Sequence, residues 1–348
     1  MKILLKKIKI ILKKIITKIV SKDRKTYPIT RIENIFYFEN IPKILLLRHD
    51  RLGDLITSTS FIRILKEKFP NYKIDILLSK KNIQAKKSIE KYINKIFILD
   101  KRLPKYFLLL RQLNKERYDL IIDLFDNPST TSAVVIKYAN PIFALGVNKS
   151  NAKIYDYTIP MLDRMTTNIV ERVCNLLIAF GINPNDNDLK LEYPVKENSV
   201  NEFRIGINLA GSNISKYWGY ENNEGLISFL LTNYENVIIR IFATGEFISI
   251  AEKLKEKFPN IIISSCNSFD NFAEEVSKCK LIISPDTSIV HLCSCFQIPI
   301  IVLYIEKKDA THSPWYPYKT KYSAITTENM LSDISLEEVK LETEKYLS

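Results

Sequence analysis

Residues 43–79 read KILLLRHDRLGDLITSTSFIRILKEKFPNYKIDILLS, and this stretch decides the fold class. An apolar run, Lys43 to Leu47, is followed by a polar turn, by a segment with helical spacing, Leu55 to Phe69, and by a second apolar run, Lys73 to Ser79. Two apolar strands that are joined through a helix form a right-handed parallel crossover. The stretch therefore predicts an α/β protein with a doubly wound, parallel sheet.

The same alternation of strands and helices occurs in two series along the chain. The first series predicts further strands at 95–99, 119–124 and 142–146 and helices at 103–115, 130–138 and 168–180. The second predicts strands at 204–209, 237–243, 260–264, 281–284 and 298–305 and helices at 225–233, 248–258, 269–279 and 288–296. A polar stretch with Pro184 and Pro194 separates them and predicts a linker. We expect an N-terminal domain at 41–183, a linker at 184–203, a C-terminal domain at 204–325 and a C-terminal helix at 331–348.

The composition is that of a globular protein with a positive charge. Of the 348 residues, 46% are apolar and 26% charged, which is ordinary for a chain with a large core. The 51 Lys and Arg residues outnumber the 39 Asp and Glu residues and give a formal charge of +12, which favours anionic partners. Nucleic acid is not expected, because the basic residues form no recognition motif and their densest block is interleaved with isoleucine instead of base-stacking aromatic residues.

The densest basic block is residues 1–25, with nine Lys, one Arg and a single acid. Lysine interrupts its apolar runs, which argues against a secretory signal, and no stretch elsewhere has the length of apolar sequence that spans a bilayer. At 100° per residue its Leu and Ile side chains share one face flanked by lysines, as is typical of an interfacial amphipathic helix. We expect this helix to bind an anionic membrane surface. Docking of its apolar face on the protein itself is the alternative.

Several cofactor classes are disfavoured by the sequence. Five cysteines, without a CxxC pair or a companion cluster of histidines, argue against a zinc site or a disulfide framework. The eight glycines form no G-x-G-x-x-G motif, which argues against a nicotinamide or flavin enzyme. We expect reduced thiols, no metal and no resident cofactor.

Two polar turns, 48–54 and 284–291, each follow a predicted strand and open a predicted helix. Free backbone N–H groups and the positive end of the helix dipole favour an anion or a polar ligand at such turns. The first turn carries Asp54, and the second carries Asp286, Thr287 and His291. We expect two domains that face each other across a cleft lined by these turns. For Asp54 taken alone, capping of the helix is an equally good interpretation.

Three segments resemble, in order and spacing, the signature regions of the family 9 glycosyltransferases, the ADP-heptose:lipopolysaccharide heptosyltransferase family. They are LLLRHDRLGDLITSTSFIRILKEKFPNYKIDIL, IGINLAGSNISKYWGYENNEGL and LIISPDTSIVHLCSCFQIPIIVLY. The resemblance covers residues 43–305 and extends through RYDLIIDL and VERVCNLLIAFGI. It implies a GT-B architecture of two Rossmann-like domains, with the acceptor on the first, the donor nucleotide sugar mainly on the second, and a C-terminal helix that crosses back.

The resemblance also implies roles for single residues. Asp54, the acid after the Gly of the first turn, falls on the candidate general base of the family. The donor contacts of the family fall on Ser212, Lys216, Glu246, Asp286, Thr287, Ser288 and His291. Arg48 and Arg51 in the first turn either bind anionic groups of an acceptor or neutralise the neighbouring acids.

The function implied by the resemblance is an inverting, metal-independent transfer of heptose, or of a related sugar, from an ADP-type nucleotide sugar to a lipopolysaccharide-core or other surface glycan. Such a transfer needs a base for the acceptor hydroxyl, and no Asp-x-Asp pair stands where a divalent cation would be chelated. The expected location is peripheral, on the cytoplasmic face of the inner membrane, with a lipid-linked glycan as acceptor. The alternative is a non-catalytic, nucleotide-binding, membrane-associated member of the family.

Overall fold

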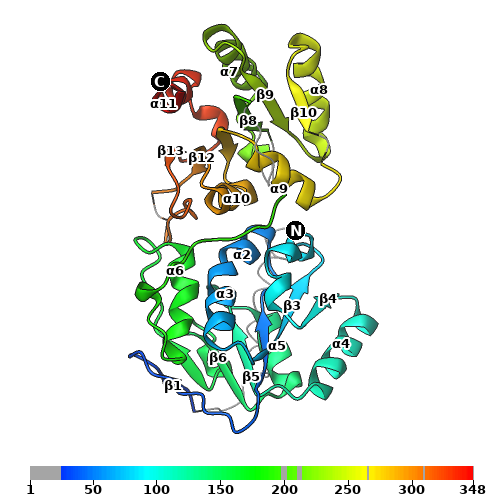
Figure 1. Ribbon diagram of the computed structural model, residues 1–348, viewed down its shortest axis with the longest axis vertical. Helices are drawn as coiled ribbons and strands as arrows, with labels where there is room; N and C mark the ends of the chain where they lie inside the picture. Colours follow the sequence, from blue (N-terminus) through cyan, green and yellow to red (C-terminus); the bar gives the residue numbers. More distant parts are fainter. Residues whose placement is uncertain (1–24, 197–201, 210–213, 265, 309, 348) are drawn as a thin grey trace, which may run out of the picture. The chain divides into compact units, whose positions relative to one another are not determined.

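The structure is a computed structural model that describes residues 25–196, 202–209, 214–264, 266–308 and 310–347. The chain forms two compact units, Met1–Asp163 with Ile169–Leu189, and Arg164–Asn168 with Lys190–Ser348. Each unit is built on one parallel sheet that carries helices (Figure 1). The α/β class predicted from residues 43–79 is therefore confirmed. The amphipathic helix expected at 1–25 lies, apart from its last residue, outside the described residues.

The first unit contains a seven-stranded sheet in the order β1-β7-β6-β5-β2-β3-β4, and every neighbouring pair is parallel. Its strands are β1 (Tyr27–Pro28), β2 (Lys43–Leu47), β3 (Lys73–Ser79), β4 (Lys95–Leu99), β5 (Leu120–Asp123), β6 (Phe143–Val147) and β7 (Tyr157–Ile159). Its α-helices are α2 (Leu52–Thr57), α3 (Thr59–Lys68), α4 (Leu103–Lys115), α5 (Thr130–Ala139) and α6 (Ile169–Cys174). Short 3-10 helices occupy Ile83–Ser88, Glu90–Tyr92, Ala152–Ile154, Asn175–Ala179 and Pro184–Asp186.

Strand β2 lies inside this sheet and is buried on both faces. Leu45 and Leu47 join the apolar cluster that contains the inner sides of α4 and α5. Ile44 and Leu46 are also fully buried and, because side chains alternate along a strand, face the opposite side of the sheet. Burial on both faces explains why the sequence of β2 is a continuous apolar run.

The helix predicted at 55–69 is in fact two helices, α2 and α3, separated at Ser58. The hydroxyls of Thr57 and Ser58 both donate to the Asp54 carbonyl oxygen, at 3.0 and 2.9 Å, and Thr59 donates to the Ile56 carbonyl oxygen at 2.8 Å. Hydroxyl side chains that bond nearby carbonyls compete with the regular helical ladder. The run of Thr and Ser therefore ends α2 after less than two turns.

The second unit contains a six-stranded sheet in the order β10-β9-β8-β11-β12-β13, again with every pair parallel. Its strands are β8 (Arg204–Asn208), β9 (Ile238–Phe242), β10 (Ile262–Ser264), β11 (Leu281–Pro285), β12 (Ile300–Ile305) and β13 (Tyr322–Thr327). Its α-helices are α7 (Tyr220–Asn233), α8 (Ile248–Lys257), α9 (Phe269–Ser277), α10 (Ser288–Phe296) and α11 (Leu336–Leu347). Short 3-10 helices occupy Ile214–Lys216, Gly245–Phe247 and Leu331–Asp333.

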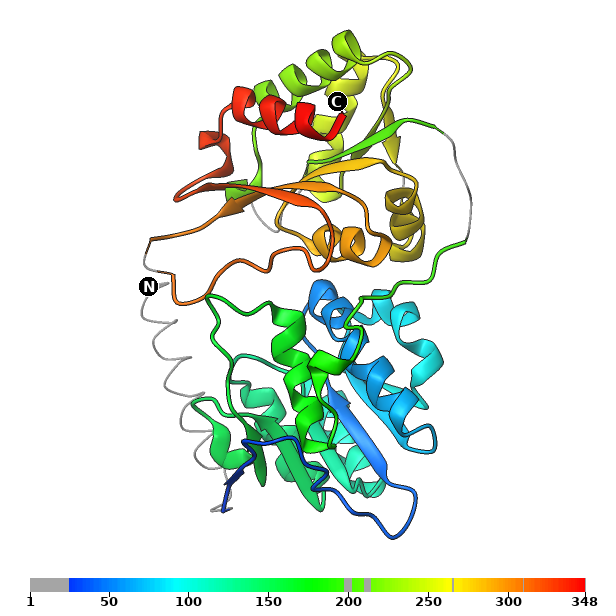
Figure 2. The same ribbon diagram turned by 60° about the vertical axis from the view of Figure 1, so that its left-hand side comes forward.

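The C-terminal helix α11 packs within the second unit. It lies beside α7 and contacts β12 and β13, as the red helix in Figure 2 shows. Trp218, which is 3% exposed, donates its indole N–H to the Ile334 carbonyl oxygen at 2.9 Å and ties the segment before α11 to the same core. Helix α11 is therefore part of the second unit, and the expectation that it crosses back stays a prediction. Within the described ranges, no helix is long and apolar enough to cross a membrane.

We expect Gly206→Ala to destabilise the second unit. A Cβ atom on Gly206 would lie 2.4 Å from Ile282 Cδ1 and 2.7 Å from Phe242 Cε2, and both side chains are buried. Overpacking of this kind costs about 1–3 kcal/mol. Chemical denaturation measures the loss in free energy of unfolding, and Lys253→Ala, on the exposed side of α8, is the control variant. An unchanged unfolding midpoint would contradict this packing.

Candidate active site

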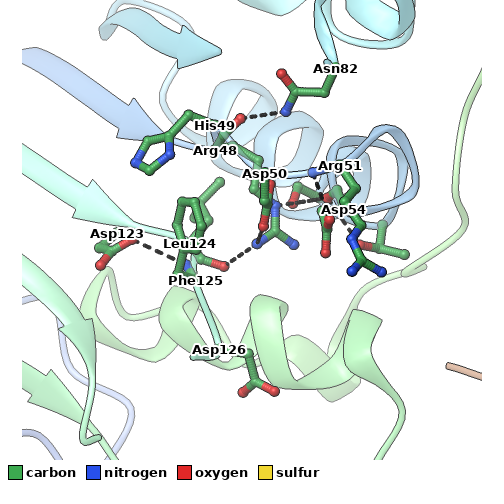
Figure 3. Close-up of polar contacts among 12 residues, drawn as sticks. Arg48, His49, Asp50, Arg51, Asp54, Asn82, Asp123, Leu124, Phe125 and Asp126 are labelled. Atoms are coloured by element: carbon green, nitrogen blue, oxygen red, sulfur yellow. Dashed lines mark hydrogen bonds and ion pairs between the residues drawn. The ribbon is translucent and has the colours of Figure 1, made fainter. Parts of the chain in front are cut away.

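The first turn lies at the carboxyl end of β2 and is organised around the Arg48 guanidinium (Figure 3). Arg48 is 1% exposed. Its Nε donates to the Asp54 carbonyl oxygen at 2.8 Å, and its Nη1 donates to the Leu124 carbonyl oxygen at 2.6 Å and reaches Asp50 Oδ2 at 3.4 Å. Asn82 donates to the Arg48 carbonyl oxygen at 2.7 Å. One cation thereby joins the turn after β2 to the end of β5.

Asp54 caps the N-terminus of α2. Its Oδ2 accepts from the Arg51 backbone N–H at 2.8 Å, and its side chain lies at the third position of α2, where an acid also complements the helix dipole. Asp54 is 6% exposed. The capping interpretation is thus correct, and the role of a base stays a prediction.

The environment of Asp50 changes its acidity. Burial, opposed by the Arg48 charge and reinforced by the Asp54 charge, raises the pKa of Asp50 to about 7. Asp50 Oδ1 and Arg48 Nη2 are both buried and have no hydrogen-bond partner within the described residues. A free acceptor and a free donor therefore lie in the same turn, and a polar ligand that both accepts and donates hydrogen bonds would satisfy them.

The two arginines of this turn have different environments. Arg48 contacts Asp50, as the neutralising interpretation expects. Arg51 is exposed, and among the described residues its guanidinium forms no ion pair with any acid. Arg51 is therefore the arginine of this turn that is open to an anionic group from solution.

A buried polar network lies behind the turn, and sequence analysis assigned no role to its residues. Asp123, at the end of β5, is fully buried and accepts from Lys149 Nζ at 3.2 Å and from the Tyr155 hydroxyl at 2.5 Å. Its Oδ1 lies 3.3 Å from the Ser132 hydroxyl, which is 3.4 Å from His49 Nε2. Burial lowers the pKa of Lys149 and lowers that of His49 to about 4, so that His49 is neutral at physiological pH. The only sequence signal for Asp123 is an acid that ends an apolar strand beside β2.

The second turn, after β11, holds an ion pair. Lys216 Nζ lies 2.7 Å from Asp286 Oδ2 and 2.9 Å from the Asp286 carbonyl oxygen. Thr287 caps α10, and its hydroxyl oxygen accepts from Asn208 Nδ2 at 3.3 Å. Asn208, at the end of β8, also donates to Ser284 Oγ at 2.9 Å. The structure thus brings Lys216, Asp286 and Thr287 together, and it adds Asn208, which sequence reasoning missed.

The other residues predicted to contact the donor sugar nucleotide differ in burial and in distance from this turn. Ser288 is half-buried at the first position of α10, and His291 is 4% exposed one turn later, with its ring centroid 6.2 Å from that of Trp315. Glu246 is exposed in the 3-10 helix after β9, two strands away from β11. Ser212 lies outside the described residues. In the part of the chain that is described, no cluster of three or more His, Cys, Asp and Glu residues fits a metal ion.

Comparisons with known proteins match most of the chain. The model of the family described as glycosyltransferase family 9 (heptosyltransferase) matches residues 106–341. Lipopolysaccharide heptosyltransferase 3 of Escherichia coli is 19% identical over 289 residues, which cover 76% of this chain and 83% of that protein.

Solved structures share the architecture of this chain. The glycosyl transferase family 9 structure from Veillonella parvula superposes with a TM-score of 0.72 at 18% identity and covers 88% of this chain and 97% of that one. The E. coli heptosyltransferase WaaC, solved with ADP, gives a TM-score of 0.71 at 17% identity and covers 87% and 99%. The GT-B fold expected from the resemblance is therefore confirmed, and the chain belongs to glycosyltransferase family 9.

Proposed function

We propose that the protein is an inverting glycosyltransferase that transfers heptose, or a related sugar, from an ADP-type nucleotide sugar to a lipopolysaccharide-core or other surface glycan. The observation that carries this proposal is the second turn, where Lys216, Asp286 and Thr287 lie together before the first turn of α10 in a chain of this family. A lysine, a hydroxyl and the positive end of a helix dipole together suit a diphosphate.

The donor would bind to the second unit. Its diphosphate would accept from the N–H groups that begin α10 and from the Lys216 ammonium group, which at present contacts Asp286. Ser288 and Thr287 hydroxyls supply further donors, and Ser212, Glu246 and His291 are proposed as the remaining contacts to the donor. These cations and donors would stabilise the negative charge that develops on the leaving diphosphate, so that no divalent cation is required.

Asp54 is proposed as the general base. Its carboxylate would take the proton of an acceptor hydroxyl as that oxygen forms a bond to the anomeric carbon, while the bond from that carbon to the diphosphate oxygen breaks on the opposite face. Inversion follows from this geometry. Because its pKa is raised to about 7, Asp50 carries a proton below that pH and then offers an O–H donor beside Asp54. This arrangement requires the two units to face each other across a cleft, with the turns after β2 and β11 on its walls.

The acceptor and its location follow from the relatives and the charge. The E. coli relative is named a lipopolysaccharide heptosyltransferase, and the exposed guanidinium of Arg51, with Arg48 behind it, suits an acceptor that carries anionic groups. We propose a lipid-linked glycan acceptor and a peripheral location on the cytoplasmic face of the inner membrane.

The nucleotide specificity is tested by thermal shift with ADP, UDP, GDP, CMP and their sugars. A ligand that binds only the folded state raises its apparent stability in proportion to RT ln(1 + [L]/Kd). We expect ADP and ADP-heptose to give the largest shifts, and a larger shift with a different nucleotide would contradict the ADP assignment. Binding of ADP-heptose without transfer to any glycan would favour the non-catalytic alternative.

We expect Asp54→Asn to lower the transfer rate by about 10²–10⁴, the usual effect of losing a general base, with ADP affinity nearly unchanged. An Asn oxygen still accepts from the Arg51 N–H, so the cap and the fold are kept. Transfer kinetics and ADP calorimetry on the same preparation measure both effects. Wild-type turnover of Asp54→Asn would leave Asp54 as a helix cap alone.

We expect Lys216→Ala to weaken ADP binding by about tenfold or more, because a charge-assisted contact to a diphosphate is lost and Asp286 is left without its cation. Lys257→Ala, which removes an exposed ion pair with Glu224 in the same unit, is the matched control and should bind ADP normally. Calorimetric titration with ADP measures the affinity of both variants. Transfer by the wild-type protein should persist in EDTA. Equal affinities in the two variants would exclude Lys216 from the donor site.

The raised pKa of Asp50 predicts how stability depends on pH. The folded state keeps a proton on Asp50 up to about pH 7, whereas the unfolded chain releases it near pH 4, so stability falls as pH rises between these values and is level above them. Asp50→Asn should remove this slope and make the protein more stable at pH 8 relative to wild type than it is at pH 5. Denaturation of both proteins at pH 5 and pH 8 measures the difference. Parallel pH profiles would show that Asp50 does not hold the proton.

A further inference from the structure

Helix α4 is apolar on two opposite sides. Its inner side carries the buried residues Leu109, Leu110 and Leu113, which belong to the core of the first unit. At 100° per residue, Phe107 and Leu108 lie on the side opposite to these leucines. Their exposed fractions are 69% and 65%. Large apolar side chains on the solvent side of an amphipathic helix are candidates for contact with a partner.

The exposed apolar surface extends beyond these two side chains. Leu103, which begins α4, is 81% exposed and lies four residues, about one helical turn, before Phe107. Strand β4 is the last strand of its sheet, and α4 stands beside it at the margin of the first unit (Figure 1). We call Leu103, Phe107 and Leu108 together the α4 patch. Clustered exposed apolar side chains of this kind mark interaction surfaces.

Residues 101–115, which contain α4, carry charges of one sign. Residues 101–115 contain five cations and no acid: Lys101, Arg102, Lys105, Arg111 and Lys115. Arg102 is neutralised by Asp100. Lys105 and Arg111 are exposed and form no ion pair within the described ranges. Cations without a neutralising acid, next to bulky apolar side chains, suit a surface with anionic groups on the outside and an apolar interior.

We propose that the α4 patch docks on an anionic lipid bilayer, with Leu103, Phe107 and Leu108 entering the interface and Lys105 and Arg111 contacting phosphate groups. A second copy of α4 would bring five more cations to the same place, and residues 1–25 would bring nine lysines. Like charges oppose both of these occupants, whereas a bilayer of anionic lipid complements the patch. This docking does not depend on the sugar that the protein transfers.

The first test removes the apolar contacts of the full chain. Its partition onto vesicles of phosphatidylcholine and phosphatidylglycerol is measured by co-sedimentation for wild type and for Phe107→Ser/Leu108→Ser. We expect a loss of about tenfold or more, since two side chains no longer enter the interface. Leu341→Ser, which changes a 59% exposed leucine on α11, is the matched control and should bind as wild type does. Because every variant keeps residues 1–25, a specific loss belongs to α4.

The second test separates local charge from total charge. Lys105→Glu/Arg111→Glu should weaken binding several-fold, while Lys253→Glu/Lys345→Glu, with the same net charge but exposed positions on α8 and α11, should not.

Three results would overturn the proposal. The first is equal binding of Phe107→Ser/Leu108→Ser and Leu341→Ser, which would be the outcome if residues 1–25 cover the patch. The second is equal weakening by the two charge reversals. The third is a lipid-free dimer that Phe107→Ser/Leu108→Ser converts to a monomer, which sedimentation velocity detects and which would assign the patch to a second copy.

Discussion

The buried guanidinium of Arg48 is the constraint on which the geometry of the first turn depends. A cation that is removed from water must be surrounded by acceptors, and Arg48 finds them in the carbonyl oxygens of Asp54 and Leu124 and in the Asp50 carboxylate. These contacts hold the end of β2, the start of α2 and the end of β5 in one arrangement. The environment of Asp50, with its raised pKa, and the place of Asp54 at the helix start both follow from it.

In the second unit, the buried side chain of Asn208 joins the ends of neighbouring strands, as Arg48 does in the first unit. The parallel strands β8 and β11 are neighbours, so their carboxyl ends lie at one edge of the sheet. Asn208 from the first strand holds Ser284 and Thr287 from the second, and Lys216 is placed on Asp286. In both units the polar residues are positioned by sheet topology. Solved relatives of 17–18% identity can therefore share the fold, because its core requires apolar strands and helices and tolerates many sequences.

Local pattern was informative where an element carries a continuous apolar run. Strands β2, β3 and β4 have the bounds that their apolar runs predict, and α10 has the bounds expected from the segment after Pro285. Prediction failed where an element depends on its neighbours. Strand β13 alternates between exposed and half-buried residues and exists because β12 pairs with it, and β1 has only two residues. The break at Ser58 depends on hydroxyl contacts that a count of apolar residues ignores.

The α/β class, the resemblance to one glycosyltransferase family and the two polar turns could all be recognised from the amino-acid order, because apolar runs and short motifs encode them locally. Which polar groups meet depends on how the elements pack. Asp123, Lys149 and Tyr155 form one buried network although they are up to 32 residues apart, and Lys216 reaches Asp286 across 70 residues. Packing also determines that Phe107 and Leu108 face outward while their neighbour Leu109 is buried. The burial of a side chain and the hydrogen bonds or ion pairs that it forms depend on residues distant in the chain that pack against it, so they cannot be read from local sequence.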